Sequence, residues 1–377
     1  MSDKGILCVV GARPNFMKIA PIMKALRDSQ DPIPAKIVHT GQHYDEAMNK
    51  QFFADLGIPK PDINLEVGSG SHAVQTAEVM RRFEPVLDQE QPAAILVVGD
   101  VNSTIACALV AAKKGVAVIH VEAGLRSYDR GMPEEINRVL TDQISDLLYT
   151  TERTALDNLA REGVDPARVH FVGNVMIDTL HHNLQKAIPA AQTLRDTEFD
   201  LSQGYALFTL HRPSNVDHEE TLRDLLETIS TVSEQIPVVF PLHPRTKSRI
   251  TQFGLDALLA SGRFILLPPV GYLHMLGLMR DARVVLTDSG GIQEETTALG
   301  IPCLTLRHNT ERPVTVDEGT NLIVGQSRQV ILAAAQDILA TGGKAGRIPE
   351  YWDGHAAERI VAHLREWLKA RASQVEA

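Results

Sequence analysis

The sequence is poor in cysteine, lacks long apolar runs and carries no excess of positive charge, and each absence excludes a class of protein. Its three cysteines, Cys8, Cys107 and Cys303, lie singly among apolar residues. They lack the spacing of a metal or redox site, and no motif places a base beside them. We therefore expect reduced core residues of a cytoplasmic protein, and no metal site.

The apolar runs are too short to cross a membrane, and the run ILCVV near the start is too short for a secretion signal. The net charge of −10 argues against non-specific binding to nucleic acid or to an anionic membrane surface. With 44% hydrophobic and 22% charged residues, the composition is that of an ordinary globular protein. Neither nucleic acid nor a membrane is expected as a partner.

Short apolar, β-branched runs alternate with segments of helical periodicity throughout the 377 residues. In the first half the runs cover residues 6–10, 35–39, 94–98, 117–121, 147–150 and 169–172. In the second half they cover residues 205–210, 238–240, 264–267, 283–287 and 302–306. Continuous apolar strands separated by helices predict parallel sheets covered on both faces, and the polar segment 193–204 separates the two sets. The sequence therefore predicts an α/β protein of two doubly wound domains.

In such folds ligands bind beyond the carboxyl ends of the strands, and the cleft between two facing domains is the default site. Residues that follow predicted strands are therefore the candidates. The string Gly68-x-Gly70-x-x-Ala73 is similar to a nicotinamide-binding fingerprint, but it does not follow the first buried strand. We expect no nicotinamide cofactor there, and Gly70–Ser71 predict the start of a helix.

Two cations follow the first predicted strand. The strand runs into GARPNFMK, where Gly11 permits a tight turn and Arg13 and Lys18 lie near the start of a helix. A helix N-terminus attracts anions, and neighbouring cations complete a phosphate site. The alternative is that both residues are solvated surface charges.

Three carboxylates come at strand ends or at a helix start in the first half. Asp100 follows the run 94–98, Glu122 follows the run 117–121, and Glu134 opens a predicted helix. Carboxylates crowded in a cleft raise one another's pKa, which suits proton transfer near neutral pH. The alternatives are a helix cap for Asp100 and a helix-dipole role for Glu134. Glu122 has no such obvious structural role.

Apolar periodicity predicts the buried sides of two helices. In the helix that begins near Glu134, Ile136, Leu140 and Ile144 have helical spacing and are expected to face the core. The final segment, 355–372, is expected to be an amphipathic helix. Its apolar residues are Ile360, Val361, Leu364 and Leu368.

Two histidines follow strands of the second half. His211 follows the run 205–210 and His243 follows the run 238–240, and an arginine is close to each in the sequence. Histidine is the side chain most easily tuned near pH 7. A lone histidine is nevertheless more often structural, so both interpretations stay open.

The stretch VLTDSGGIQEET carries the clearest ligand signal. After the strand, Ser289, Gly290 and Gly291 offer a hydroxyl and unobstructed backbone N–H groups at a helix start, which is a cradle for a diphosphate. Glu295, in the first turns of that helix, can accept hydrogen bonds from both hydroxyls of a ribose. Arg312 adds a counter-charge. The alternative is an ordinary glycine-rich turn.

A set of segments, in order along nearly the whole chain, resembles the non-hydrolysing UDP-N-acetylglucosamine 2-epimerases. They are GARPNFMK, TGQHYD, VVGDVNST, HVEAGLRS, MPEEINR, HRPSN, LTDSGGIQEE and TERPV. The resemblance implies a glycosyltransferase-B-type fold of two Rossmann-like domains with an inter-domain cleft and a last helix that returns to the first domain. It implies an N-terminal domain of residues 1–172 with 356–377, and a UDP-binding domain of residues 173–355.

The family interconverts UDP-N-acetylglucosamine and UDP-N-acetylmannosamine without a cofactor, usually as a homodimer, and serves cell-surface polysaccharide biosynthesis. One carboxylate removes the C2 proton while UDP leaves C1, and UDP re-adds to 2-acetamidoglucal after the proton returns to the opposite face. The resemblance implies that Asp100, Glu122 and Glu134 handle the proton and that His211 stabilises the departing diphosphate. The substrate contacts that it implies are Arg13, Lys18, His43, Arg138, His243, Ser289, Gly290, Gly291, Glu295 and Arg312.

Two segments depart from the family pattern. Many members have His-Arg-Arg-Glu-Asn where this chain has HRPSN at 211–215. Some bind an activating substrate molecule through a second glutamine near the present Gln42, and Asp45 stands at that position here, which removes the basis for expecting such activation. Relatives that epimerise UDP-2,3-diacetamido-2,3-dideoxyglucuronate share similar strings, so that substrate stays an alternative. The sequence is also compatible with a glycosyltransferase, a hydrolysing epimerase or a nucleotide-sugar-binding regulator.

Overall fold

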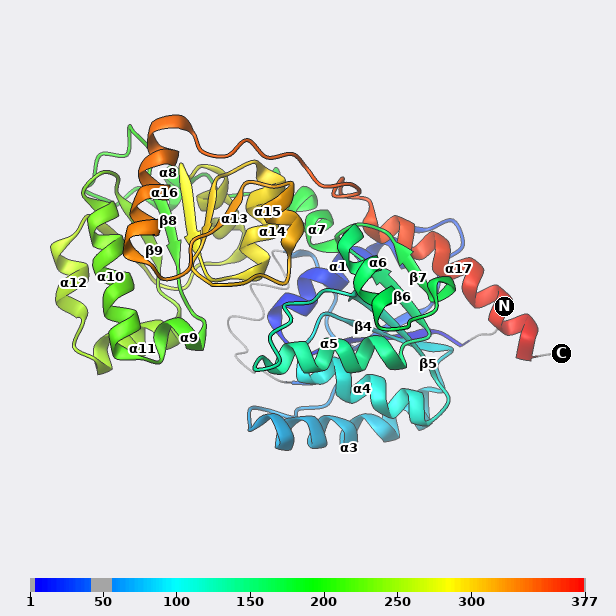
Figure 1. Cartoon of the computed structure of the whole chain (residues 1–377). Coiled ribbons are helices and arrows are strands. Elements are labelled where there is room, and N and C mark those ends of the chain that lie inside the picture. The colour runs from blue at the N-terminus through cyan, green and yellow to red at the C-terminus, as the bar shows by residue number, and fades with distance from the viewer. Residues whose placement is uncertain (1–3, 42–55, 376–377) are drawn as a thin grey trace. The chain divides into compact units, whose positions relative to one another are not determined.

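The structure is a computed structural model that describes residues 4–41 and 56–375 (Figure 1). It leaves out the side chains of Arg13, Ser261 and residues 374–375, and the predicted contact His43 and the departing position Asp45 lie outside the described residues. The chain divides into two compact units. Unit 1 comprises Met1–His182 and Glu350–Ala377, and unit 2 comprises Asn183–Pro349.

Unit 1 contains a parallel sheet with the strand order β3-β2-β1-β4-β5-β6-β7. The strands are β1 (Ile6–Val10), β2 (Ala35–His39), β3 (Ile63–Asn64), β4 (Ala94–Val98), β5 (Ala117–Ala123), β6 (Leu147–Thr150) and β7 (Val169–Phe171). The predicted apolar runs form these strands, and every side chain of β1, β4 and β5 is buried, as expected for a sheet covered on both faces. The strand order reverses between β1 and β4, which is where doubly wound sheets bind ligands.

Helices between the strands provide the cover. They are α1 (Arg13–Asp28), α3 (His72–Glu90), α4 (Asn102–Lys113), α5 (Pro133–Ile144), α6 (Arg153–Arg161), a short 3-10 helix (Pro166–Arg168) and α7 (Val175–Leu184). Leu7 and Val9 of β1 share one core with Val79 of α3, whereas Ile6 and Cys8 are buried on the opposite side of the strand. All three cysteines are buried and free, as predicted.

The orientation of α5 differs from the prediction. Ile136 is 43% exposed and Leu140 is 50% exposed, so the expected buried stripe is wrong for these two residues. The helix buries Glu135, Arg138 and Asp142 instead. The reason is that Arg138 pairs with Asp100 beyond the end of β4, and Asp142 pairs with His120 of β5. The polar face of α5 therefore packs inward.

The last helix, α17 (Ala356–Val375), belongs to unit 1 and is amphipathic as predicted, with Ile360 and Leu364 fully buried. Asp178 of α7 caps its start by accepting hydrogen bonds from the N–H groups of Ala356 (3.1 Å) and Ala357 (2.7 Å). These two hydrogen bonds connect α7 to α17, so most of α7 belongs to unit 1. The unit therefore extends to residue 182, whereas the sequence placed the boundary after residue 172.

Unit 2 contains a second parallel sheet with the order β10-β9-β8-β11-β12-β13. Its strands are β8 (Ala206–Thr209), β9 (Val238–Pro241), β10 (Phe264–Leu267), β11 (Val284–Thr287), β12 (Cys303–Thr305) and β13 (Asn321–Ile323). Its helices are α8 (Ala190–Thr193), α9 (Pro213–Val216), α10 (Glu219–Ser233), α11 (Pro244–Gln252), α12 (Asp256–Ser261), α13 (Tyr272–Arg280), α14 (Gly290–Leu299), α15 (Pro313–Asp317) and α16 (Arg328–Thr341). The strand order reverses between β8 and β11.

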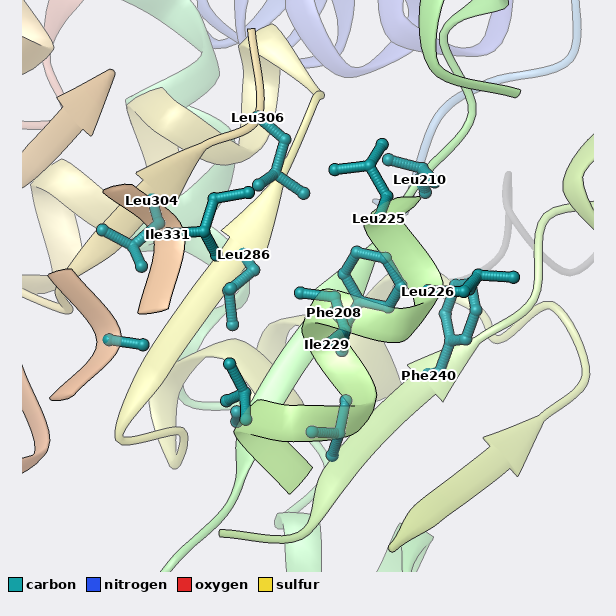
Figure 2. Close-up of a cluster of buried hydrophobic side chains, with 14 of the residues drawn as sticks. Phe208, Leu210, Leu225, Leu226, Ile229, Phe240, Leu286, Leu304, Leu306 and Ile331 are labelled. Carbon is teal, nitrogen blue, oxygen red and sulfur yellow. The ribbon is translucent and has the colours of Figure 1, made fainter. Parts of the chain in front are cut away.

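The core of unit 2 joins its sheet to α10 and α16. Figure 2 shows Leu225, Leu226 and Ile229 of α10 packed beside the aromatic rings of the neighbouring strands. The rings of Phe208 and Phe240 lie 4.4 Å apart between centroids. This core fixes the ends of β8 and β11, and therefore the residues that follow them.

Candidate active site

Asp100 and Glu122 come from neighbouring strands of unit 1. β4 and β5 pair in parallel as far as Val98 and Val121, so both acids lie just beyond the paired ends. The register of β5 shifts after Val121, and Glu122 has a φ of 72°, which is rare for a residue with a side chain. Glu122 is only 4% exposed. Such strain persists only where the surrounding contacts enforce it.

Lys18 of α1 supplies the contact that holds Glu122. Its ammonium group forms an ion pair with the Glu122 carboxylate, and both side chains are buried. Gly99 keeps this space open, since a Cβ there would lie 3.0 Å from Lys18 Nζ and its φ of 67° also favours glycine. Asn15 ties α1 to the sheet by donating to the Val98 carbonyl at 3.0 Å. The interpretation of Lys18 as a solvated surface charge is therefore wrong.

Arg138 of α5 holds Asp100. Its Nε and Nη2 lie 2.9 and 2.7 Å from Asp100 Oδ2, and its Nη1 lies 2.6 Å from Glu135 Oε2. The N-cap of α4 is Val101, so Asp100 is not the helix cap considered from the sequence. Glu134 is partly exposed in the first turn of α5 and shares a helix face with Arg138, four residues later.

A buried network supports the turn that carries Asp100. His120 is completely buried, with Nδ1 2.7 Å from Asp142 Oδ1 and Nε2 2.9 Å from the carbonyl oxygen of Gly99. Arg126 lies 2.7 Å from Asp142 Oδ2. Burial by itself would raise the pKa of Asp142, but the hydrogen bond to His120 and the charge of Arg126 hold it below its usual value. The ionised Asp142 therefore anchors the network.

His211 and Asp288 meet at the switch point of unit 2, where they follow β8 and β11. His211 Nδ1 lies 2.8 Å from Asp288 Oδ1, and the backbone N–H groups of His211 and Arg212 donate to the same carboxylate at 3.0 and 2.8 Å. Burial would raise the pKa of Asp288, but these donors lower it. The fixed carboxylate directs His211 Nδ1 inward. The His211 side chain is 37% exposed, which leaves Nε2 for a ligand.

The turn before α14 lies beside a buried cluster of charges. Ser289 is the N-cap of α14, and its hydroxyl makes no capping hydrogen bond. A Cβ on Gly290 would lie 2.8 Å from Arg312 Nη1, so a side chain at this position would have to displace the guanidinium. Arg312 pairs with Glu294 at 2.8 Å and with Glu311 at 2.7 Å. Arg312 thus lies next to the predicted diphosphate cradle, but two buried carboxylates share its charge.

Glu295 lies in the same helix and is 4% exposed. Tyr272 of α13 donates a hydrogen bond from Oη to Glu295 Oε1 at 2.9 Å. Burial raises the pKa of Glu295 to about 7, the neighbouring charge of Glu294 adds to the rise, and the hydrogen bond from Tyr272 opposes it. This carboxyl group therefore titrates near neutral pH.

His243 is the N-cap of α11, the structural role that the sequence left open for it. Its Nδ1 accepts a hydrogen bond from the backbone N–H of Arg245 at 3.3 Å. Its ring centroid lies 5.6 Å from that of His211. Burial lowers the pKa of His243, and His211 lowers it further. His243 is thus a neutral neighbour of His211.

The sequence identified Lys18 and Arg138, which hold Glu122 and Asp100, but it missed other residues that support the site. Glu135 and Asp142 were missed because the apolar residues of α5 predict a different buried face of this helix. The residues Glu135, Arg138 and Asp142 have the same helical spacing as an apolar stripe, and this polar stripe was the available signal. Tyr272 carried no signal, because its partner is 23 residues away in the sequence.

The described part of the chain contains no group of three or more histidine, cysteine, aspartate and glutamate side chains arranged to hold a metal ion. Within the same residues, no helix has both the length and the apolar character that crossing a bilayer requires.

Known proteins match this chain over nearly its full length. The family model described as UDP-N-acetylglucosamine 2-epimerase matches residues 24–365. A UDP-N-acetylglucosamine 2-epimerase of Methanocaldococcus jannaschii is 42% identical over 361 residues, which cover 94% of this chain and 97% of the relative. A UDP-2,3-diacetamido-2,3-dideoxy-D-glucuronate 2-epimerase of Pseudomonas aeruginosa is 41% identical over 364 residues, which cover 95% of this chain and 99% of the relative.

A solved structure extends the similarity to three dimensions. The crystal structure of the Methanocaldococcus jannaschii enzyme in complex with UDP-N-acetylglucosamine and UDP has a TM-score of 0.88 and 42% identity, covering 96% of this chain and 99% of that chain. Both sheets of the present chain are parallel and doubly wound. The prediction of a glycosyltransferase-B-type fold built from two Rossmann-like domains is confirmed.

Proposed function

This chain belongs to the UDP-N-acetylglucosamine 2-epimerase family, and we propose that it interconverts UDP-N-acetylglucosamine and UDP-N-acetylmannosamine without hydrolysis. The observation that carries the proposal is the pair of strand-end carboxylates in unit 1, Asp100 and Glu122, each held by a cation. An ionised, positioned carboxylate is a suitable base for proton abstraction next to a bond that is breaking. The 2-epimerases that this chain resembles support the same reaction class.

In the proposed reaction, a carboxylate removes the proton from C2 of the sugar while the C1–O bond to UDP breaks. The C–H electron pair becomes the C1=C2 double bond of 2-acetamidoglucal, and UDP departs with the electron pair of the C1–O bond. Return of a proton to the opposite face of C2 and re-addition of UDP at C1 give the epimer. Two faces require two acid/base groups, which we assign among Asp100, Glu122 and Glu134, with the third orienting the others.

The C2 hydrogen is weakly acidic, so the departing diphosphate must be stabilised. We assign this task to His211, whose Nδ1 is fixed by Asp288 and whose Nε2 would donate to a phosphate oxygen. The Ser289 hydroxyl and the first N–H groups of α14, from Gly290 and Gly291, would donate as well, at the positive end of the helix dipole. These groups all belong to unit 2, which we propose to be the UDP-binding unit.

Further contacts complete the proposed nucleotide-sugar site. Glu295 would accept hydrogen bonds from the ribose hydroxyls, because it is a buried carboxylate next to the diphosphate cradle. Lys18 and Arg138 orient Glu122 and Asp100 through their ion pairs. The remaining contacts that we propose are Arg13, His43, His243 and Arg312.

A second substrate is supported by a specific observation. The Pseudomonas aeruginosa relative, a UDP-2,3-diacetamido-2,3-dideoxy-D-glucuronate 2-epimerase, is 41% identical to this chain. That value is almost the same as the 42% identity to the Methanocaldococcus jannaschii UDP-N-acetylglucosamine 2-epimerase. The same proton transfer at C2 would serve both sugars, so the diacetamido uronate is the alternative substrate.

We also propose that the enzyme is a homodimer and that α5 contributes to the interface. Ile136 and Leu140 are 43% and 50% exposed and lie four residues apart on one face of that helix. Adjacent large apolar side chains on a surface helix favour burial against a partner. The opposite face of α5 carries Arg138, so a dimer would also fix the helix that holds Asp100.

We place the enzyme in the cytoplasm, in the supply of nucleotide sugars for cell-surface polysaccharides. Three buried and free cysteines are consistent with a reducing compartment. The polysaccharide role follows from the family resemblance.

The experiment that tests the function is proton NMR of the purified protein with UDP-N-acetylglucosamine in deuterium oxide. The manno epimer with deuterium at C2 is the expected product, because the abstracted proton exchanges with solvent. No exchange while UDP still binds would contradict the substrate, and the diacetamido uronate would be tested next in the same way. Accumulation of UDP and free sugar would indicate a hydrolysing epimerase, and turnover that depends on an added acceptor would indicate a glycosyltransferase.

A further inference from the structure

Glu295 and Tyr272 form a buried pair at the proposed ribose position of unit 2. Tyr272 opens α13, Glu295 lies in α14, and the two residues are 7% and 4% exposed. The Tyr272 hydroxyl donates to Glu295 Oε1 at 2.9 Å. Burial raises the pKa of Tyr272, and the charge of Glu295 raises it further, so the phenol keeps its proton and acts as a donor.

The adjacent glutamate in α14 has a different environment. Glu294 Oε1 lies 2.8 Å from Nε of Arg312, so that carboxylate is ion-paired with a buried cation. Among the described residues, Tyr272 donates a hydrogen bond to the Glu295 carboxylate, and this hydrogen bond goes to Oε1. A neutral donor orients a carboxylate without cancelling its charge. Glu295 therefore presents a directed and still anionic Oε2.

We propose that Tyr272 is a positioning residue that holds Glu295 so that Oε2 accepts a hydrogen bond from a ribose hydroxyl, and that it thereby sets the preference for a ribonucleotide over a deoxyribonucleotide. The inference rests on the proposed function only in that a UDP moiety occupies this site. It assigns to Tyr272 a role in specificity that acts through Glu295, since the phenol itself is engaged by the carboxylate.

The ionisation of Glu295 supports this role. Burial and Glu294 raise the pKa of Glu295, and the hydrogen bond from Tyr272 acts in the opposite direction. The groups that face the carboxyl are Tyr272 from α13 and Glu294 from its own helix, with Arg312 behind Glu294. Tyr272 is thus the group that favours the anion, which is the better acceptor for a sugar hydroxyl.

The experiment measures the dissociation constants of UDP, 2′-deoxy-UDP and 3′-deoxy-UDP by calorimetry at pH 8. The proteins are the wild type, Tyr272→Phe, Glu295→Gln and the double variant. We expect the wild type to bind UDP about tenfold or more tightly than at least one deoxy analogue, as for a hydrogen bond to a charged group. Tyr272→Phe should reduce the ratio of the dissociation constant of the deoxy analogue to that of UDP at least about threefold. The double variant should show the same ratio as Glu295→Gln, because Tyr272 acts through Glu295.

Tyr205→Phe is the matched control. Tyr205 is 4% exposed, lies in unit 2 and donates from Oη to the carbonyl of Leu278 on α13 at 2.6 Å. The Tyr205→Phe variant loses one buried hydroxyl. This loss should change the free energy of unfolding without changing the ratio of dissociation constants. An unchanged ratio in Tyr272→Phe, an equal reduction in Tyr205→Phe, or a wild type that binds all three nucleotides equally would each overturn the inference.

The role of Tyr272 in nucleotide preference and the proposed epimerase reaction can be contradicted separately. Nucleotide binding requires no turnover, so the ratio is measured whether or not deuterium enters C2. An intact ratio without exchange at C2 would contradict the epimerase and leave the role of Tyr272 standing. Exchange at C2 with an unchanged ratio in Tyr272→Phe would contradict only the role of Tyr272. A protein that does not bind UDP would overturn the inference, and the exchange assay would then decide the function independently.

Discussion

Lys18 and Glu122 form a buried ion pair at the point where β5 leaves its regular register. Glu122 has a φ of 72°, and the Lys18 ammonium group lies next to the space that Gly99 keeps open. A positive φ is costly for a residue with a side chain, and the ion pair is a contact that compensates this cost. The carboxylate is therefore held in a fixed orientation before any substrate binds, which is what a positioned base requires.

Replacement of Glu122 by glutamine should abolish epimerisation and leave UDP binding largely intact. The amide cannot take the C2 proton, so we expect turnover to fall by about 10²–10⁴-fold. UDP affinity should change by less than about threefold, because the variant leaves unchanged the groups of unit 2 that are proposed to hold the diphosphate and the ribose. Calorimetry with UDP and deuterium incorporation at C2 measure the two effects. Turnover near that of the wild type would contradict the assignment of Glu122.

Replacement of Asp288 by asparagine should act through His211. The variant keeps a carbonyl oxygen for the backbone N–H groups of His211 and Arg212 but loses the charge that fixes the imidazole. We expect kcat to fall about tenfold to hundredfold, as for partial loss of a group that stabilises developing charge. The double variant with His211→Asn should be no slower than His211→Asn alone. Additive losses in steady-state kinetics would show that Asp288 acts independently of His211.

Replacement of Glu295 by glutamine should stabilise the protein at high pH. The folded-state pKa of about 7 is raised above the usual value of 4.5, so Glu295 contributes stability below pH 4.5 that is lost as the pH rises through 7. Above pH 7 the buried carboxylate is ionised and its burial destabilises the fold, by about 3 kcal/mol for a shift of this size. Glutamine avoids that charge and can still accept from Tyr272.

Urea unfolding at pH 8 and pH 5 tests this expectation. Glu295→Gln should be more stable than the wild type at pH 8, and most of the difference should disappear by pH 5. Glu220→Gln, at an exposed position of α10, is the control and should change the free energy of unfolding by less than about 0.5 kcal/mol at both pH values. A stability gap for Glu295→Gln that is equal at both pH values would mean that ionisation is not its cause.

The positions of most strands along the chain were predictable from the sequence because each buried strand is a continuous apolar run. The predicted runs match β1, β2 and β4 to β7 in the first sheet and β8 to β12 in the second. β3 and β13 were missed, since Ile63–Asn64 and Asn321–Ile323 each contain an asparagine and do not stand out as apolar runs. The orientation of α5 was predicted wrongly because ionic partners, which periodicity does not report, outweigh the burial of Ile136 and Leu140.

The candidate site was predictable where a residue follows an apolar run, and not where it depends on a distant partner. Asp100 and His211 follow strands and Glu122 lies near the end of β5, and topology alone brings such residues to one edge of their sheet. Asp288 also follows a strand, but its partner His211 is 77 residues away in the sequence. No local pattern encodes that contact, because the reversal of strand order between β8 and β11 creates it.

The exposed apolar face of α5 predicts that two charges placed there will separate the proposed dimer. Ile136→Asp with Leu140→Asp puts two carboxylates where an apolar surface would be buried, and unpaired buried charges are strongly unfavourable. We expect light scattering to change from about twice the chain mass of 41.3 kDa to the mass of one chain, with an unchanged circular dichroism spectrum. Both side chains are already exposed in the single chain, so its fold should tolerate the change.

Val330→Asp is the control for this variant, because Val330 is an apolar residue of α16 in unit 2 with 48% exposure. It should remain dimeric. If the α5 variant also remains dimeric, this helix face is not the interface. If it becomes monomeric and its turnover falls while UDP binding persists, the dimer supports the face of α5 that positions Arg138 against Asp100. One face of α5 would then form the dimer interface, and the opposite face would position the proposed proton-transfer groups.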